Sequence, residues 1–248
     1  MRTRTRDPTL RGVGEARRES ELNWGLHSAD VLGMSKSGHS RRIEVRVPSR
    51  VLSAGTRTAL ERLGYQLVPA SPRGAAPDAR IVAAGRLSRL RAEASEPVIL
   101  VGGSRSREVD DPRVVGVVQR PIGILELYQL LQVALEAHPR EVPRAPVSLA
   151  ARTLRDGVDA PGAILSLSEK GCLLRSPARL SGVGTLRLQF MLPNEGLIYT
   201  RADLRHEAGE ESGLAFDGLP ETSRAAIADF VMATLTVGPE AVGAHPCQ

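Results

Sequence analysis

The sequence predicts two small domains, an α/β domain with a parallel sheet and then an all-β antiparallel barrel that carries a C-terminal helix. Three observations lead to this fold class. Short β-branched runs alternate with helical patterns over residues 42–137, a proline-rich stretch follows, and residues 148–235 hold short alternating runs before one amphipathic helix. A chain of 248 residues is long enough to bury two such cores.

The composition is that of a globular protein with aliphatic cores. Hydrophobic residues make up 42% and charged residues 25% of the chain, whereas aromatic residues make up only 3%. No run approaches the roughly 18 apolar residues of a membrane span, and the N-terminus lacks the apolar segment of a secretory signal. We therefore expect a bacterial-type cytoplasmic protein. Two cysteines, Cys172 and Cys247, are too few for a disulfide framework or a zinc cluster.

The net charge of +5 has two interpretations. It favours anionic partners such as nucleotides. It also fits an arginine bias that reflects a GC-rich genome, because Lys36 and Lys170 are the only lysines. No aromatic residues interleave with the arginines as a stacking platform for single strands, so nucleic acid is not an expected partner.

The two ends of the chain are expected to be unfolded. Residues 1–40 are rich in Arg, Ser and Gly without a sustained period, which predicts a disordered basic segment. Met34 is an alternative start, in which case residues 1–33 do not belong to the native chain. Between this segment and a flexible tail at residues 238–248, we expect the α/β domain at residues 41–138 and the barrel at residues 139–237.

The elements of the α/β domain follow one another closely. Strand-like runs lie at residues 43–47, 65–70, 79–85, 97–103 and 114–118. A helical pattern in residues 56–63 has Gly64 as its expected stop. A second helix is expected at residues 122–137, where four apolar side chains fall near one face: Ile124, Leu127, Leu131 and Leu135.

The order of these elements, with the segments GYQLVPA, PVILVGG and VVQRPIGILELYQLL, resembles a response-regulator receiver domain over residues 42–137. A receiver needs two acids after its first strand, a phospho-accepting Asp after the third, a Thr or Ser after the fourth, and a Lys before a Pro after the fifth. The residues found there are Pro48 and Ser49, Ala83 or Ala84, Gly102, and Arg120. Without carboxylates nothing holds magnesium or accepts a phosphoryl group, so the resemblance implies a pseudo-receiver that acts only through its surface.

A domain boundary is expected at HPREVPRAPVSL, because Pro139, Pro143 and Pro146 exclude a helix. Short strand-like runs follow at residues 148–154, 162–168, 171–176, 185–192, 197–207 and 212–219. The last element, residues 220–235, has four apolar side chains on one helical face: Ala226, Ile227, Phe230 and Val231. Such an order predicts a small barrel that the helix plugs or flanks.

Two motifs stand out in this β-rich part. Arg140-Glu-Val-Pro-Arg144 lies just before the first strand, and Ser166-Leu-Ser168-Glu-Lys-Gly171 lies between the second and third. With the segments RLQFMLP and GLAF and the closing helix, they resemble a PilZ domain over residues 140–236. That family has R-x-x-x-R before its first strand and D/N-x-S-x-x-G between its second and third strands.

The PilZ resemblance implies an effector that binds cyclic di-GMP and is not an enzyme, with no catalytic residue, metal or cofactor. The ligand-binding residues that it implies are Arg140, Arg144, Ser166, Ser168 and Gly171. An Arg guanidinium engages phosphate oxygens or a guanine edge in bidentate fashion. A Ser hydroxyl donates or accepts, and a Gly permits close approach of the backbone to a ligand.

Ser166 departs from the acidic or amide residue of the family motif. The departure leaves an alternative, a PilZ-like interaction adaptor that does not bind the nucleotide. Both alternatives require a protein partner, which the sequence does not identify. By analogy with the family, the regulated process is motility, surface polysaccharide or biofilm control.

Overall fold

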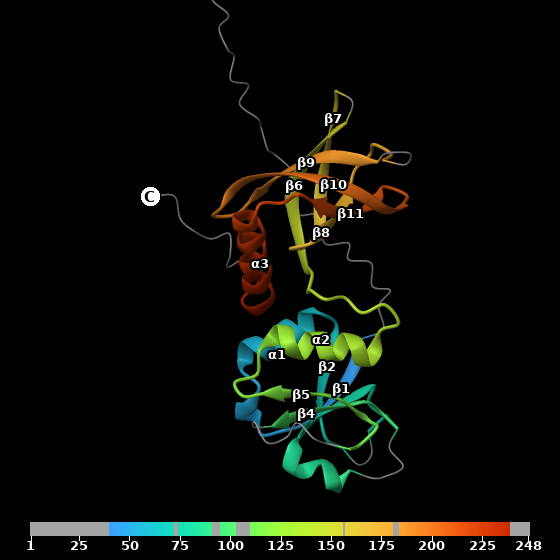
Figure 1. The fold of residues 1–248 in the computed structure, drawn as a ribbon, viewed down its shortest axis with the longest axis vertical. Coiled ribbons are helices and arrows are strands. Elements are labelled where there is room, and N and C mark those ends of the chain that lie inside the picture. Colours follow the sequence, from blue (N-terminus) through green and yellow to red (C-terminus); the bar gives the residue numbers. More distant parts are fainter. Residues whose placement is uncertain are drawn as a thin grey trace, which may run out of the picture.

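The computed structural model describes residues 40–71, 74–90, 95–102, 110–155, 157–180 and 184–238. An α/β unit runs from β1 to α2, and a closed barrel with its helix runs from β6 to α3, stacked on the α/β unit (Figure 1). Both parts of the predicted fold class are confirmed. The expectations for residues 1–39, for a start at Met34 and for residues 239–248 fall outside the described residues.

The α/β unit is built on a five-stranded parallel sheet in the order β2-β1-β3-β4-β5. This is the strand order of flavodoxin-like sheets, and it agrees with the predicted receiver-like arrangement. The strands are β1 (Arg41–Arg46), β2 (Tyr65–Pro69), β3 (Ala79–Ala83), β4 (Val98–Gly102) and β5 (Val114–Gln119). The helices are α1 (Ala54–Arg62), α2 (Ile124–Leu135) and the short 3-10 helices η1 (Ser49–Val51) and η2 (Ala84–Arg89).

Helix α1 ends before Gly64, as its sequence predicts, and begins two residues before the predicted pattern at residues 56–63. The Ser53 hydroxyl accepts a hydrogen bond from the Thr56 backbone N–H at 3.0 Å, which caps the first turn. Gly64 follows the helix with a φ of +90°, a conformation that favours glycine. The sheet is covered on both faces, because Ile81 packs with α1 and α2 whereas its neighbour Val82 packs below η2.

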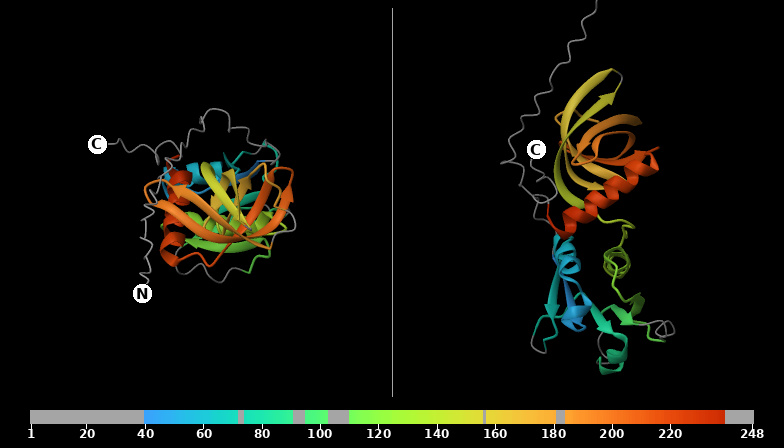
Figure 2. Two further views of the ribbon diagram at one scale, coloured as in Figure 1. Left: turned by 90° about the horizontal axis from the view of Figure 1, so that it is seen from above. Right: turned by 90° about the vertical axis from the view of Figure 1, so that its left-hand side faces the viewer.

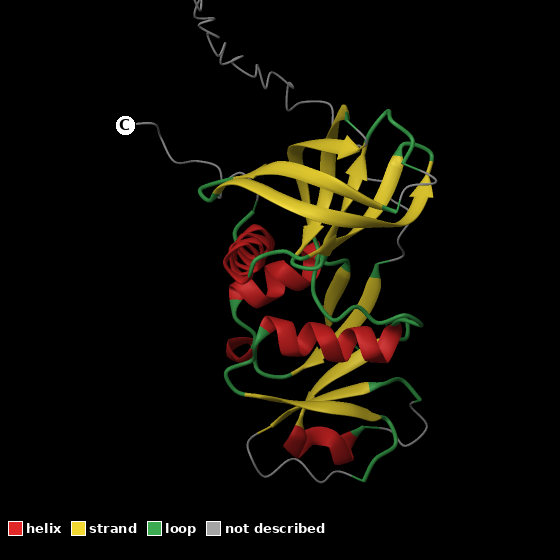
Figure 3. Cartoon of the chain, turned by 45° about the horizontal axis from the view of Figure 1, so that its top comes forward, coloured by secondary structure: helices red, strands yellow, loops and turns green. Residues whose placement is uncertain are grey.

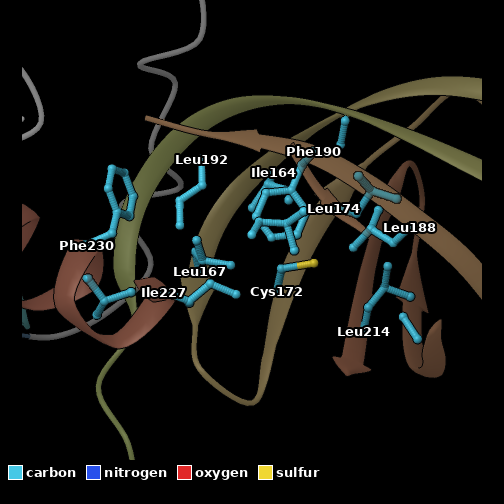
Figure 4. Packing of buried hydrophobic residues seen from close by; sticks show 14 of the residues in the cluster. Ile164, Leu167, Cys172, Leu174, Leu188, Phe190, Leu192, Leu214, Ile227 and Phe230 are labelled. Atoms are coloured by element: carbon cyan, nitrogen blue, oxygen red, sulfur yellow. The ribbon is translucent and has the colours of Figure 1, made fainter. Parts of the chain in front are cut away.

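The barrel closes six antiparallel strands in the order β10-β11-β8-β7-β6-β9. The strands are β6 (Ala145–Arg155), β7 (Val158–Ser168), β8 (Gly171–Arg175), β9 (Thr185–Leu192), β10 (Gly196–Ala208) and β11 (Glu211–Asp217). Its core is mostly aliphatic, with Phe190 close to Ile164 and Leu174 (Figure 4). The Phe190 ring stacks on Phe216 at a centroid distance of 6.2 Å. Helix α3 (Glu221–Thr236) packs Ile227 and Phe230 against this core, which confirms the predicted helical face.

Helices α1 and α2 lie between the sheet and the barrel (Figure 3). Ala59 of α1 is fully buried in the barrel's hydrophobic cluster. The Arg62 Nη1 donates to the Thr234 and Leu235 carbonyls at the end of α3, at 2.8 and 3.0 Å (Figure 2 shows α3 from the side). A boundary between residues 138 and 139 stays a prediction, and this stretch lies between α2 and β6. None of the described helices is both long and apolar enough to cross a membrane.

Candidate ligand-binding site

Residues 139–144 connect α2 to β6 without helix or strand, and we call them the strap. Pro139 and Pro143 prevent the helix from continuing, as the sequence predicts. Ala145 then pairs with Leu167, and Pro146 pairs with Ser166. The strap therefore enters the barrel beside the end of β7.

The two arginines of the strap carry charges that other described residues do not neutralise. Arg140 is exposed and Arg144 is half-buried, close enough to interact electrostatically with Cys172 of β8 and Tyr128 of α2. Burial, and then the positive charge of Arg140, lower the pKa of the Arg144 guanidinium. Within the described part of the chain, neither arginine side chain has a hydrogen bond or an ion pair.

The SLSEKG segment forms the hairpin turn between β7 and β8. Ser168 and Gly171 pair across it, and the Ser168 Oγ donates to the Gly171 carbonyl at 3.0 Å. Ser168 is only 1% exposed, so its hydroxyl closes the turn from inside. A Cβ at Gly171 would lie 2.1 Å from the Leu214 carbonyl oxygen of β11. This position therefore requires a glycine because the backbone of a neighbouring strand lies close to it.

Ser166 is half-buried at an irregular place in the sheet. The register of β7 against β8 shifts between Ile164 and Ser166, and that of β6 against β7 shifts between Pro146 and Leu149. Bulges of this kind re-aim side chains and are common beside functional sites. In the sequence, Ser166 lies between the core residues Ile164 and Leu167.

An ion pair connects the strap to the turn. The Lys170 Nζ at the tip of the hairpin donates to a carboxylate oxygen of Glu141. The bond lowers the pKa of the Glu141 carboxyl below its ordinary value. The two motifs that the sequence singles out therefore lie side by side in the folded chain.

The model of the PilZ domain family matches residues 137–233, which span the strap, the barrel and most of α3. The chain carries a PilZ domain. A comparison with curated proteins gave no match.

Several solved structures are similar to part of the chain. The PilZ domain of Escherichia coli YcgR with c-di-GMP is 16% identical, with a TM-score of 0.33 over 40% of this chain and 92% of that one. The inhibitor of motility of Bacillus subtilis is 18% identical, with a TM-score of 0.34 over 38% of this chain and 50% of that one. The PlzA protein of Borreliella burgdorferi in complex with c-di-GMP is 22% identical, with a TM-score of 0.27 over 33% of this chain and 32% of that one. The chain thus spans about half of the Bacillus structure and less of the Borreliella one.

An open cavity of about 550 Å³ lies beside the strap. Its wall combines Arg140 and His138 with residues of the α/β unit: Ser40, Arg41, Leu63, Gly64, Tyr65, Gln132 and Glu136. Arg41 is paired with Glu136 at 3.3 Å, whereas Arg140 is a cation without such a partner among the described residues. The cavity therefore presents a positive charge at its edge.

Sequence reasoning missed three polar residues around the PilZ motifs. Gln129 and Gln132 of α2 bind the strap backbone, and Glu141 binds Lys170. In the sequence, the two glutamines are unremarkable polar positions of a predicted helix. Only the tertiary structure brings that helix against the strap.

The residues that replace the functional residues of a receiver lie at or just after the ends of the parallel strands. Ala83 is the last residue of β3 and Gly102 is the last of β4, while Arg120 directly follows β5. Pro48 and Ser49 follow β1 after a short connection. Among the described residues, no group of three His, Cys, Asp or Glu side chains is placed to hold a metal ion.

Proposed function

We propose that the chain is a cyclic di-GMP effector without catalytic activity that relays the ligand level to a protein partner. One observation carries the proposal. Arg144 is half-buried beside Arg140, and neither guanidinium has a counter-ion within the described residues. A cation in such a place is costly unless an anion compensates it, and the phosphates of a dinucleotide supply that anion.

The surroundings of the strap support a ligand with both phosphates and bases. Guanidinium groups bind phosphate oxygens or the O6 and N7 of guanine in bidentate fashion. The hairpin turn lies against the strap, and Ser166 before it is half-buried. Arg140 lines a cavity of about 550 Å³, within the usual size of small-molecule sites, whereas Arg144 and Ser166 do not belong to its lining. Arg140, Arg144 and Ser166 would contact the ligand, while Ser168 and Gly171 would shape the turn that presents it.

The α/β unit fits a pseudo-receiver that acts through its surface. Its strand ends carry Ala83, Gly102 and Arg120 in place of the residues that phosphoryl transfer needs. We infer that residues 41–138 and 139–237 act as two domains in a bacterial cytoplasm. Ligand binding at the strap between them would favour one arrangement of the two, a population shift that a partner protein detects. By family analogy, the process is motility, surface polysaccharide or biofilm control.

Calorimetric titration with cyclic di-GMP tests the site. Replacing either Arg140 or Arg144 by Ala should cost about 2–5 kcal/mol of binding free energy, as when one member of a buried charge pair is truncated. Arg201 and Arg205 provide a matched control, because they have the same spacing but lie exposed on β10, near Asp217 and Asp203. The control double variant should bind like the wild type. Unchanged binding in the Arg140 and Arg144 double variant would refute the site.

A second candidate function is an interaction adaptor that does not bind the nucleotide. Two observations favour it: Ser166 replaces an acid or amide, and the Ser168 hydroxyl already donates to the Gly171 carbonyl. If the wild-type protein does not bind cyclic di-GMP in the titration, the adaptor is the better explanation.

A further inference from the structure

Two glutamine side chains of α2 bind the strap that bears Arg140 and Arg144. The Gln132 Oε1 accepts from the Arg140 backbone N–H at 2.9 Å. One turn earlier in the helix, the Gln129 Nε2 donates to the Glu141 carbonyl at 3.0 Å. Two successive residues of the strap are therefore held by the α/β unit.

The Gln132 amide is itself fixed from the other side. Its Nε2 donates to the Tyr65 hydroxyl at 2.8 Å, and the side chains of Gln132 and Tyr65 are both buried. An amide offers one acceptor and one donor group. With the donor group directed to Tyr65, the oxygen is left for the strap. Two successive hydrogen bonds thus connect Tyr65 of β2 to Gln132 of α2 and Gln132 to the Arg140 backbone.

This arrangement matters because, apart from the exposed ion pair between Lys170 and Glu141, the strap has no regular structure to order it. It is neither helix nor strand, and it carries two cations that repel each other. A free segment of this kind loses conformational entropy when it closes on a ligand, whereas a segment that is already held loses less. Contacts that hold the strap near its binding position therefore raise affinity without touching the ligand.

We propose that Gln129 and Gln132 are positioning residues, through which the α/β unit preorganises the arginines of the strap for an anionic dinucleotide. The inference rests on the proposed function, since it deepens how the same site works. Coupling between binding sites is reciprocal, so a bound ligand would also strengthen the hold of α2 on the strap. Changes in the α/β unit would then alter the affinity of a site whose arginines belong to the PilZ domain.

The full-length variants Gln129→Ala and Gln132→Ala test the proposal. Gln129 is exposed and alanine favours helix, so the first variant should fold like the wild type. Val133→Ala is the control, because Val133 is 61% exposed on the same helix and has no contact of this kind with the strap. We expect the Kd for cyclic di-GMP to rise about three- to tenfold in either glutamine variant, as for loss of one net hydrogen bond. The Kd of the Val133→Ala control should equal that of the wild type.

Tryptic cleavage after Arg140 and Arg144, measured by mass spectrometry without nucleotide, reports the order of the strap directly. Cleavage should be faster in Gln129→Ala than in the wild type, at an unchanged melting temperature, which a purely global loss of stability would not produce. Unchanged Kd values in both glutamine variants, or tighter binding, would overturn the proposal. If no protein in the series binds the nucleotide, the proposed function fails, and the cleavage rates alone decide whether α2 holds the strap.

Discussion

Lys170 and Glu141 form an ion pair that joins the tip of the β7–β8 hairpin to the middle of the strap. The two residues are 29 positions apart in the chain. Both side chains are exposed, so water screens the pair and it adds little to stability. Its importance is its place, because it ties the residue that follows Arg140 in the sequence to the hairpin turn.

Replacing Glu141 by Gln should strengthen cyclic di-GMP binding about two- to tenfold at low salt, since a negative charge near the phosphates is removed and Lys170 is released. The gain should shrink as salt is added. Glu195→Gln is the matched control, because it removes the same charge from the exposed β9–β10 turn. Equal effects of the two variants would show that net charge alone matters.

The difference in cyclic di-GMP affinity between the wild type and Glu141→Gln should depend on pH. Lys170 lowers the pKa of Glu141, so the wild-type carboxylate loses its charge at a lower pH than an ordinary glutamate does. The affinity difference between wild type and Glu141→Gln should therefore persist down to about pH 5 and vanish at lower pH. A difference that disappears already between pH 7 and 6 would contradict the assignment to this carboxylate.

Ser166→Asp should tighten cyclic di-GMP binding by about 1–2 kcal/mol, as for a hydrogen bond gained to a charged group. The Watson–Crick edge of guanine has two adjacent N–H donors, and a carboxylate accepts both, whereas a serine hydroxyl meets one. Repulsion from the ligand phosphates opposes the gain, and Arg140 and Arg144 should offset it. Titration of both proteins side by side measures the difference. Weaker binding in the variant would mean that the turn does not face a guanine edge.

Gly171→Ala should destabilise the barrel by about 1–3 kcal/mol whether or not ligand is present, as overpacking does. The new Cβ would lie 2.1 Å from the Leu214 carbonyl oxygen, a backbone atom that moves only if β8 and β11 separate. Gly85→Ala is the control, since a Cβ there meets nothing within 4 Å. Urea unfolding measures the free energy of unfolding of both variants. A fully stable Gly171→Ala protein that fails to bind ligand would instead support direct contact at this glycine.

The α/β unit should not accept a phosphoryl group, because Ala83 ends β3 at the position of the phosphoacceptor. Incubation with acetyl phosphate and magnesium, followed by intact-mass measurement, should show no added mass. A stable adduct mapped to residues 42–137 would show that the receiver comparison was made in the wrong register.

Local patterns predicted most of the fold. The Gly64 end of α1, the apolar face of α3 and the six strand-like runs of the barrel depend on residues near in sequence, and each has a counterpart in the structure. The starts of β6 and β7 were predicted too late, at residues 148 and 162 in place of Ala145 and Val158. Pro146 pairs with Ser166 inside the strand, because an irregular register accommodates a residue that lacks a backbone N–H.

The candidate site was predictable only in its motif residues. Arg140 and Arg144 are recognised from their spacing and their position before the first strand, but their lack of counter-ions among the described residues depends on how the chain folds around them. The reason for Gly171 is likewise non-local, since its close neighbour, Leu214, lies on another strand of the barrel.

By itself, the sequence determined the two fold types, the PilZ motifs and the mismatches to the receiver residues, because each depends on residue type and short-range order. Only the tertiary structure decided that α2 holds the strap through Gln129 and Gln132, and that Lys170 meets Glu141. These contacts join segments from different elements, and side-chain hydrogen bonds have no periodicity that a linear pattern records. The packing of α1 and α2 between sheet and barrel is what brings the donors and acceptors together.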